Sequence, residues 1–562
     1  MKPRSFFVLL AAVTIFSLAL AGWGTALVLG HSPLNLAQGG VSRSPMAPGL
    51  IPGQSPIMVS LLVNPDRLEA FTQLAVNPGR RRRSHRELAE LEQSLLAKTG
   101  LDYRKEVKPW LGEEVTLAVT DLDYDHNGSN GAQPGYLLVV HSQDPELSRE
   151  FLQLSYATAA IAGDTDLVFD RYQGVKITYK HPVNPVPNGN LLASAVVGDY
   201  VLFANHPQVL RQALNSLQAP SLSLAQAETY QQALASLNDP KLGIVYANFP
   251  ALAAWLGQRP AIDKNSDQTA IEQTLTVALS LQAQGLVAHT ALTGVPSNNP
   301  GEKEENIPVI KTNLVNLPSS SSLVINGQNL AHQWQQLATG LAPHSPLQQA
   351  VSKLVYDWQQ PLGLDLTTDI FPWVQSDYEL IFLPKTNPSQ SDWVFVAQDL
   401  DAAATDVALE HLDQLAIAAG YQLSTLDLDG QRVLAWTSLQ TMAKENITSL
   451  QTQVRGVHCR VGDRVILASS LEALSQVLDQ TSPSLADQPE FQQALSTLPD
   501  DSYVYLDWQR GEPFFSQQLP VLRVLELSLK PLFKNLRSLT INQEPGSTSI
   551  SNSTIYLNLG VD

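Results

Sequence analysis

One stretch of this sequence occurs twice, and the repeat limits what the chain can fold into. Residues 196–214 read VVGDYVLFANHPQVLRQAL and residues 460–478 read RVGDRVILASSLEALSQVL, so the offset between Gly198 and Gly462 is 462 − 198 = 264. Val-Gly-Asp between two β-rich runs predicts a tight hairpin, because glycine adopts a positive φ without steric cost. Each hairpin leads into a predicted helix with one apolar stripe, which can be buried against a sheet.

Matching segments on both sides of this stretch extend the repeat over most of the chain. They keep one order and nearly one spacing, which chance similarity between helices hardly produces. The sequence therefore predicts an α+β fold: a tandem duplication of one lobe made of an antiparallel sheet with helices, preceded by one N-terminal transmembrane helix. The matched segments are Leu101-Asp102 with Leu364-Asp365, Pro109-Trp110 with Pro372-Trp373, Ser223-Leu224-Ala225 with Ser484-Leu485-Ala486, Tyr230–Leu234 with Phe491–Leu495, and Val245-Tyr246 with Val504-Tyr505.

This reading divides the chain into five segments. A chain of 562 residues is long enough for several domains. Stretches rich in Pro, Gly, Ser and charged residues predict the connections between them. The segments are a signal anchor or transmembrane helix at 1–30, a flexible Pro/Gly/Ser tether at 31–55, the first α+β repeat at 56–295, a linker at 296–319 and the second α+β repeat at 320–562.

The N-terminus predicts a membrane anchor. Lys2 and Arg4 precede the apolar run Phe6–Leu29, which is long enough to cross a bilayer. By the positive-inside rule the N-terminus is cytoplasmic and the folded body lies on the other side. A cleaved signal peptide is the alternative, since Ala19-Leu20-Ala21 offers a cleavage site. The apolar run continues to Leu29, which favours an uncleaved anchor.

Composition narrows the class of protein. The net charge of −18 argues against a general nucleic-acid binder, because phosphate groups repel such a chain. A hydrophobic content of 44% is typical of a globular protein. The single cysteine, Cys459, excludes an internal disulfide and any Cys-x-x-Cys motif. Cys459 falls in a predicted strand and is expected to be a packed thiol.

One acidic stretch has the pattern of a site for a hard cation. Asp123, Asp125 and Asn127 alternate before Gly128, and Ca²⁺ takes several closely spaced oxygen ligands on a turning loop. An EF-hand would place a bidentate Glu where this chain has Pro134, and acidic residues beside Asn-Gly also occur in plain hairpin turns. We expect an exposed, metal-free loop and no cofactor, with calcium as the alternative.

A basic run stands out from the acidic chain. Arg80, Arg81, Arg82 and Arg83 precede a predicted helix over residues 87–98. Such a run can contact anionic lipid or an acidic partner. It can equally be a solvated loop, which we prefer.

The sequence contains no Gly-x-Ser-x-Gly, P-loop, dinucleotide-binding or His-Glu-x-x-His motif. His141 and His289 fall in predicted strands and are expected to be structural. A Ser-His-Asp triad assembled only in space stays open, because its order along a chain is not fixed. The sequence therefore leans against an enzyme.

Four motifs occur together with the N-terminal apolar run: Thr-Gly-Leu-Asp at 99–102, Pro-Trp-Leu-Gly at 109–112, the strand Gly135–Val140 and Val-Gly-Asp-Tyr at 197–200. Together they resemble an uncharacterised family of large anchored proteins, Domain of Unknown Function 3352, found chiefly in cyanobacteria. The resemblance covers nearly all of the chain after the tether. It implies an envelope or thylakoid location and an unassigned activity, and it assigns no catalytic residue.

These observations predict a membrane-tethered protein with its bulk in the periplasm or thylakoid lumen. Its two lobes would bind a protein partner as a non-catalytic binding or scaffold module. One alternative is a carrier or chaperone-like module for a lipid or apolar ligand, which a large apolar cavity would favour. The second alternative is a hydrolase, which a cleft with a perturbed histidine, a carboxylate and a serine would favour.

Overall fold

The computed structural model describes residues 40–64, 107–182, 192–255, 273–294, 315–340, 364–385, 391–518 and 536–559, with short gaps inside these ranges and isolated positions between 348 and 359. In this part of the chain the strands form one continuous sheet. Every ladder in it is antiparallel. The predicted α+β fold with a large antiparallel sheet is thereby confirmed.

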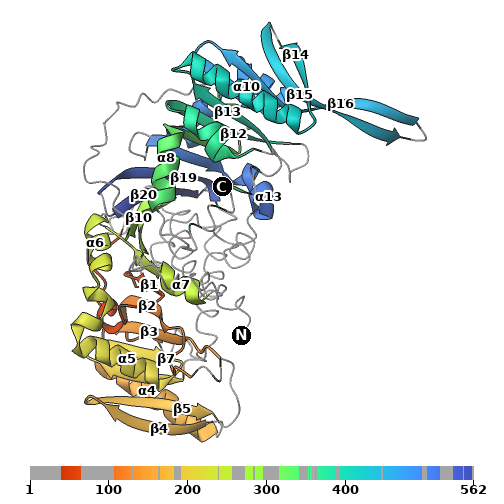
Figure 1. The fold of residues 1–562 in the computed structure, drawn as a ribbon. Helices are drawn as coiled ribbons and strands as arrows, with labels where there is room; N and C mark the ends of the chain where they lie inside the picture. Colours follow the sequence, from red (N-terminus) through yellow and green to blue (C-terminus); the bar gives the residue numbers. More distant parts are fainter. Residues whose placement is uncertain are drawn as a thin grey trace, which may run out of the picture.

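The first lobe comprises the elements up to residue 294. Its strands pair in the order β4–β5–β6–β7–β3–β2–β1–β8–β9–β10. Helices α5 and α6 pack on one face of this sheet, and α4 packs on the other (Figure 1). The strands are β1 (Ile57–Leu61), β2 (Leu111–Asp121), β3 (Gly135–Ser142), β4 (Thr165–Tyr172), β5 (Val175–Pro182), β6 (Ala193–Val197), β7 (Tyr200–Ala204), β8 (Gly243–Asn248), β9 (Thr274–Gln282) and β10 (Gly285–Thr293). The helices are η2 (Ala47–Leu50), α4 (Pro145–Ala162), α5 (Pro207–Gln218), η4 (Pro220–Leu222), η5 (Leu224–Gln226), α6 (Glu228–Ser236) and α7 (Phe249–Trp255).

The second lobe comprises the elements from residue 315 onward. Its strands pair in the order β14–β15–β16–β17–β13–β12–β11–β18–β19–β20. The strands are β11 (Leu323–Gln328), β12 (Asp377–Pro384), β13 (Ser391–Gln398), β14 (Gln422–Leu428), β15 (Gln431–Lys444), β16 (Ile447–Val461), β17 (Arg464–Ala468), β18 (Tyr503–Asp507), β19 (Leu536–Ser547) and β20 (Ile550–Leu559). The helices are α8 (Leu330–Gly340), η7 (Leu366–Ile370), η8 (Phe371–Trp373), α10 (Ala402–Ala418), α11 (Leu471–Leu478), η9 (Leu485–Asp487), α12 (Pro489–Ser496) and α13 (Trp508–Gln518).

Strands β10 and β20 join the two lobes into one sheet. They pair along nine residues, from Gly285 opposite Asn558 to Thr293 opposite Ile550. From this junction outward, the strands of each lobe follow in corresponding order, so β4 and β14 lie at the two ends of the sheet. In Figure 1 the lobes accordingly lie at opposite ends of an elongated, curved molecule.

The ladders of the two lobes also correspond in register. Phe203 and Leu467 hold the same place in the ladders β3–β7 and β13–β17, and 467 − 203 = 264 is the offset of the two Val-Gly-Asp hairpins. The same matching of positions can be continued through each neighbouring ladder to the junction. There, His289 of β10 holds the position in the first lobe that Thr554 of β20 holds in the second. These two residues face each other at the junction, and His289 Nδ1 lies 3.0 Å from Thr554 Oγ1.

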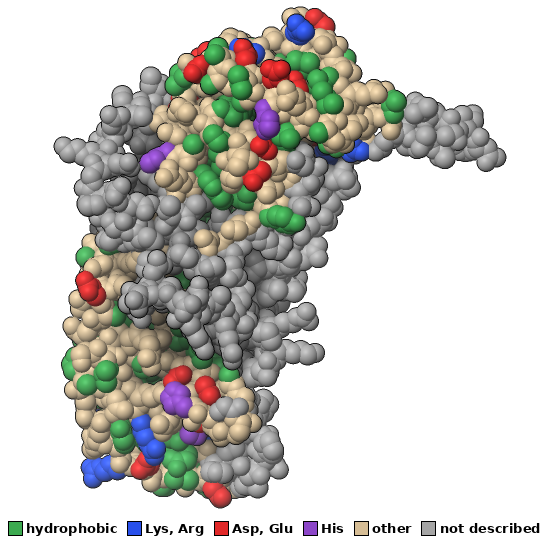
Figure 2. Space-filling model, viewed as in Figure 1, with side chains coloured by type: hydrophobic (Ala, Val, Ile, Leu, Met, Phe, Trp, Pro, Cys, Tyr) green, Lys and Arg blue, Asp and Glu red, His purple; other side chains and the backbone are tan. Residues whose placement is uncertain are grey.

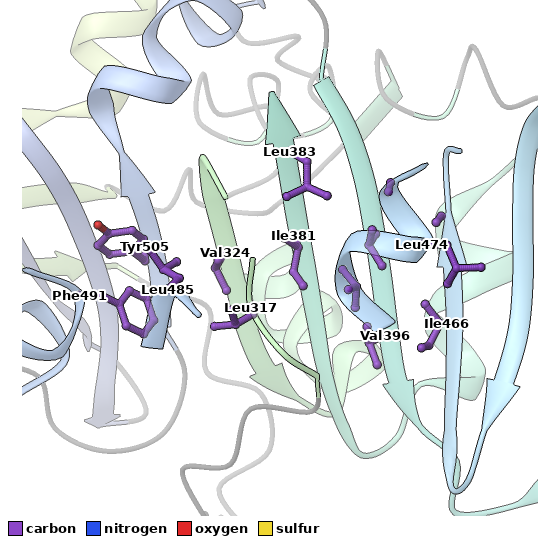
Figure 3. Close-up of a cluster of buried hydrophobic side chains, with 14 of the residues drawn as sticks. Leu317, Val324, Ile381, Leu383, Val396, Ile466, Leu474, Leu485, Phe491 and Tyr505 are labelled. Atoms are coloured by element: carbon purple, nitrogen blue, oxygen red, sulfur yellow. The ribbon is translucent and has the colours of Figure 1, made fainter. Parts of the chain in front are cut away.

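Each lobe has its main core on the face that carries the amphipathic helix after the Val-Gly-Asp hairpin. In the first lobe, Val209, Leu210 and Leu214 of α5 are fully or almost fully buried against the strands. In the second lobe, Leu474 of α11 packs beside strand residues such as Val396, as Figure 3 shows. The apolar stripe predicted from the repeated stretch is therefore the part of each helix that holds it on the sheet.

The two hairpins form as predicted. Gly198 connects β6 to β7 with a φ of +56°, and Gly462 connects β16 to β17 with a φ of +63°. Positive φ strains residues that have a Cβ, so glycine is the residue these turns require.

Strands β4 and β14 are difficult to recognise from the sequence, because each has a mixed sequence and pairs with one neighbour only. Near the C-terminus, Pro545 and Gly546 form a pair that is typical of turns. They lie within β19, whose register with β20 shifts between Glu544 and Ser547.

Residues 40–55 are not a flexible tether, which corrects that part of the prediction for 31–55. Val41 forms a bridge with Lys241, and Pro52 forms one with Ser223. Ile51 is fully buried in the core of the first lobe. This segment is therefore a built-in part of that lobe.

A buried carboxylate explains why this segment is held. Glu114 of β2 is 4% exposed. It accepts hydrogen bonds from the backbone N–H groups of Met46 (3.0 Å) and Ala47 (2.9 Å), at the start of η2. A carboxylate at the first N–H groups of a helical turn satisfies donors that have no partner within the turn. The Pro/Gly-rich composition of the segment predicts a flexible linker, because composition carries no information about a contact with a residue as distant in the sequence as Glu114.

The junction between the lobes can be tested at Gly285. A Cβ at this position would lie 2.1 Å from the backbone oxygen of Leu557 in β20. We expect Gly285→Ala to lower the free energy of unfolding by about 1–3 kcal/mol, the usual cost of overpacking. Urea unfolding measures the change. Gly49→Ala is the control, since a Cβ at Gly49 would meet nothing within 4 Å. Equal stability of the two variants would contradict the expected role of the junction.

Candidate functional site

Helix α4 lies on the sheet with one of its faces. Leu152, which is 8% exposed, packs with Val140 of β3 and Val201 of β7. Ser148 is fully buried, and its hydroxyl donates to the Pro145 carbonyl at 2.9 Å. Residues 148 and 152 are one helical turn apart, so they mark the inner face of the helix.

A polar contact ties the second half of α4 to the sheet. The Tyr156 hydroxyl donates to the Thr178 carbonyl of β5 at 3.0 Å and lies 2.8 Å from Ser194 Oγ of β6. Burial raises the pKa of Tyr156 to about 12, and the hydrogen bond with Ser194 partly opposes this shift. Tyr156 therefore stays neutral and serves to position the helix.

The outer face of α4 is apolar from residue 151 onward, whereas its first turns carry the exposed side chains of Glu146, Arg149 and Glu150. Leu147, Leu154 and Ile161 are 36%, 70% and 87% exposed. They recur at every seventh residue and so form one stripe along the helix. Residues 151–162 contain no charged side chain. Single exposed apolar residues are normal on a protein surface, but a row that continues over the uncharged second half of a helix indicates an interaction surface.

Strand β4 continues this surface beyond the helix. Asp170 forms an ion pair with Arg211 of α5, so its neighbours Phe169 and Arg171 point to the opposite face of the sheet. That is the face of α4, because Phe169 pairs with Thr178, the residue that Tyr156 contacts. The Phe169 ring is 60% exposed there.

One cation lies over the exposed Phe169 ring and another lies over the Tyr156 ring. Lys176 Nζ lies 4.6 Å from the centroid of the Phe169 ring, and Lys180 Nζ lies 5.7 Å from that of Tyr156. Partial burial lowers the pKa of Lys180. On the face of the molecule that Figure 2 shows, hydrophobic, basic and acidic side chains all occur at this end of the first lobe. We call the following set the α4 surface: Leu147, Leu154, Ile161, Phe169, Arg171, Lys176 and Lys180.

The corresponding helix of the second lobe has the same inner face and a different outer one. Helix α10 begins at Ala402, and 402 − 145 = 257 aligns it with α4. Its Leu409, 9% exposed, takes the place of Leu152. Outside, His411 stands where α4 has Leu154, and exposed Asp406 and Glu410 make the surface acidic.

A pair of a buried histidine and a partly buried carboxylate in the second lobe takes the place of the Tyr156–Ser194 contact. His458 Nε2 of β16 lies 3.0 Å from Asp413 Oδ1 of α10. The same carboxylate oxygen accepts a hydrogen bond from Trp436 Nε1 at 2.7 Å. His458 is only 3% exposed, so its imidazole does not face solvent. This arrangement ties α10 to the sheet rather than presenting a general base to a substrate.

The acidic loop between β2 and β3 uses its oxygens within the loop. Asp123 Oδ1 accepts the N–H of Gln133 at 3.2 Å, and Asp125 Oδ1 accepts the N–H of Asn127 at 3.0 Å. Asn127 Oδ1 accepts the N–H of Ser129 at 3.2 Å. The last two are the short-range turns typical of Asp and Asn in hairpin loops, and the bond from Gln133 to Asp123 closes the loop across ten residues. Among the described residues there is no group of three or more His, Cys, Asp or Glu that could hold a metal.

Three other predicted residues lie in structural surroundings. Cys459 is 3% exposed, and burial raises the pKa of its thiol to about 11, so it is a packed thiol as predicted. His141 Nδ1 accepts the N–H of Glu113 at 3.4 Å. His289 lies at the junction of the lobes. These residues are far apart in the sheet and do not form one site.

Two predicted features lie outside the described residues. They are the basic run Arg80–Arg83 and the anchor Phe6–Leu29. Within the described part of the chain, no helix has both the length and the apolar character that a membrane crossing requires.

The outer face of α4 is not among the features expected from the sequence. Apolar residues around a whole helix are usually read as burial, and residues 145–162 carry apolar side chains on both faces. Two features of the sequence point to an apolar outer face. No residue from 151 to 162 is charged, and Leu147, Leu154 and Ile161 are spaced seven residues apart. No comparable feature of the sequence indicates that Phe169 and Arg171 of β4 belong to the same surface, because β4 itself is not recognisable as a strand from its sequence.

Comparisons with known proteins give a family. The family described as a protein of unknown function (DUF3352) matches residues 10–559, nearly the whole chain. No curated protein matches.

Two solved structures of TP0453 show a distant likeness. Crystal form III has 10% sequence identity and a TM-score of 0.23, and the match covers 46% of this chain and 82% of that one. Crystal form I has 9% identity and a TM-score of 0.23, with 44% and 79% covered. At these TM-scores the likeness carries no argument about fold or function.

The calcium alternative predicts a measurable effect on stability. An ion bound with a Kd of about 10⁻³ M, as in weak extracellular sites, would stabilise the protein by about 1.4 kcal/mol at ten times that concentration. We expect no rise in melting temperature with Ca²⁺ relative to chelator, because Asp123 and Asp125 bond to their own loop. A rise that disappears in the Asp123→Ala, Asp125→Ala double variant would show that the loop binds calcium.

Proposed function

The chain belongs to the family of proteins of unknown function DUF3352, and on this premise we propose that it is a membrane-tethered, non-catalytic binding module. Its anchor is the apolar run Phe6–Leu29, and its two lobes lie outside the cytoplasm. The lobes present different surfaces to different partners and so act as a scaffold. The second lobe binds a protein.

One observation carries this proposal: two corresponding helices keep their inner contacts and differ on the outside. Leu152 of α4 and Leu409 of α10 are buried alike. Leu154 and His411 hold one position on the outer faces, one apolar and one polar. Inner residues are constrained by packing, whereas outer residues are constrained by what they contact. Different outer faces on one framework are what a module with two kinds of partner needs.

We further propose that the lobes arose by tandem duplication. The repeated Val-Gly-Asp stretches, the corresponding order of strands and the common register of the ladders support this origin. A duplicated framework also explains how Tyr156–Ser194 and Asp413–His458 come to make the same helix-to-sheet contact with different chemistry.

The anchor is tested by membrane fractionation of the native protein. We expect the full chain to stay with membranes after an alkaline wash, because a transmembrane helix is held by the bilayer and not by charge. Mass spectrometry should find peptides from within Phe6–Leu29. A mature N-terminus at Gly22, with release into the alkaline supernatant, would contradict the anchor.

The binding role of the second lobe is tested on the outer face of α10. Glu410 is exposed, and Glu410→Lys reverses one charge there. We expect the variant to lose at least one protein that cross-links to the wild-type chain in its native membrane. The matched control is Gln153→Lys, which puts the same residue at the corresponding exposed position of α4. Identical sets of cross-linked proteins from wild type and Glu410→Lys would contradict binding through this face.

A further inference from the structure

We propose that the α4 surface docks the first lobe onto a lipid bilayer that carries anionic headgroups. The inference deepens the proposed function and rests on it for the anchor that brings this lobe to a membrane. It assigns the bilayer itself, and not a second protein, as the partner of this end of the molecule.

The apolar half of the surface has the geometry of an interfacial helix. Leu154 and Ile161 project from a helix whose last twelve residues, 151–162, carry no charge. A helix that lies at a bilayer surface buries one apolar face among the headgroups and needs no length to span. Here the opposite face of the helix is already fixed to the sheet through Leu152 and Tyr156. Docking therefore requires no refolding of α4.

The charged half selects the kind of bilayer. Arg171 and Lys176 form the cross-strand pair next to the Phe169–Thr178 pair, on the same face of the sheet, and Lys176 reaches over the exposed Phe169 ring. The chain as a whole carries a net charge of −18, so an anionic membrane repels most of its surface. Basic residues beside exposed apolar ones replace this repulsion locally by attraction to the anionic headgroups. The attraction of each basic residue falls off within a Debye length. The α4 surface is the described region where exposed apolar rows and cations meet.

The path of the chain places this lobe nearest to the anchor. The described chain begins at residue 40, and Val41 is bridged to Lys241 of the first lobe. Ten residues, such as those between 30 and 39, span at most about 35 Å when fully extended. The first lobe is therefore held close to any bilayer that contains Phe6–Leu29. The second lobe follows on the far side of the β10–β20 junction.

The second lobe supplies an internal contrast. On α10, Val407 is 69% exposed, much like Leu154 at 70%. It stands between Asp406 and Glu410, however, on an acidic face. Exposure alone therefore does not distinguish the two helices. The charge around the apolar residues does, and it predicts that only α4 meets an anionic bilayer.

The test uses the full chain with an environment-sensitive fluorophore on Leu154→Cys. The native Cys459 does not compete for the label, because it is 3% exposed. The protein is reconstituted into vesicles of phosphatidylcholine alone or of equal parts phosphatidylcholine and phosphatidylglycerol. We expect a blue shift and a rise in emission only in the anionic vesicles. Salt at about 1 M, which shortens the Debye length to about 3 Å, should reduce both.

Two variants complete the design. Val407→Cys carries the same label on α10 and should report water in both kinds of vesicle. Adding Lys176→Gln and Arg171→Gln to Leu154→Cys should abolish the shift while the far-ultraviolet circular dichroism and melting temperature stay unchanged, since both side chains are exposed.

Flotation of the vesicles separates this inference from the proposed anchor. Protein that floats with both vesicle types but shows no shift at Leu154→Cys keeps its anchor and overturns the docking. Protein that floats only with anionic vesicles, and shows the shift, lacks the anchor but docks. An equal shift in both vesicle types, or at Val407→Cys, would overturn the proposal of an anionic bilayer as the partner of the α4 surface.

Discussion

The ladder between β10 and β20 is the contact on which the whole architecture depends. Each strand would otherwise be the last of its lobe, with a row of unpaired N–H and C=O groups that invites aggregation. Pairing them satisfies both rows at once and turns two lobes into one sheet. Because His289 and Thr554 are counterparts that face each other, the junction is close to a twofold arrangement. The edges that remain, β4 and β14, lie at the far ends of the molecule.

This arrangement leaves the ends of the sheet free to diverge. Near the junction, a residue on one lobe is constrained by the other, whereas the described packing partners of α4 and α10 belong to their own lobe. Their inner faces are still constrained by packing against the sheet, as the similar burial of Leu152 and Leu409 indicates. The polar contacts that hold the two helices on the sheet differ: α4 uses Tyr156 with Ser194, and α10 uses Asp413 with His458. Their outer faces differ most, and those are the surfaces to which we assign partners.

Buried polar groups in both lobes hold elements in place. Glu114 binds the N–H groups at the start of η2 and so fixes the segment after the tether. The Asp413 carboxylate contacts the His458 imidazole and accepts a hydrogen bond from the Trp436 indole N–H. Unpaired groups of this kind would cost several kcal/mol in a dry interior, so each must be satisfied before the apolar contacts can stabilise the fold. The same groups could be mistaken for catalytic ones if burial were ignored.

The sequence by itself determined the local elements: the Val-Gly-Asp hairpins, the amphipathic helices α5 and α11, and an antiparallel α+β fold. These follow from glycine conformation and hydrophobic periodicity, which act between residues close in the chain. Only the tertiary structure decided the rest. The pairing of β10 with β20, the hydrogen bonds from Met46 and Ala47 to Glu114, and the solvent-facing side of α4 all depend on contacts between residues far apart in sequence. A helix that is apolar on two sides does not reveal which side is covered until the sheet is in place.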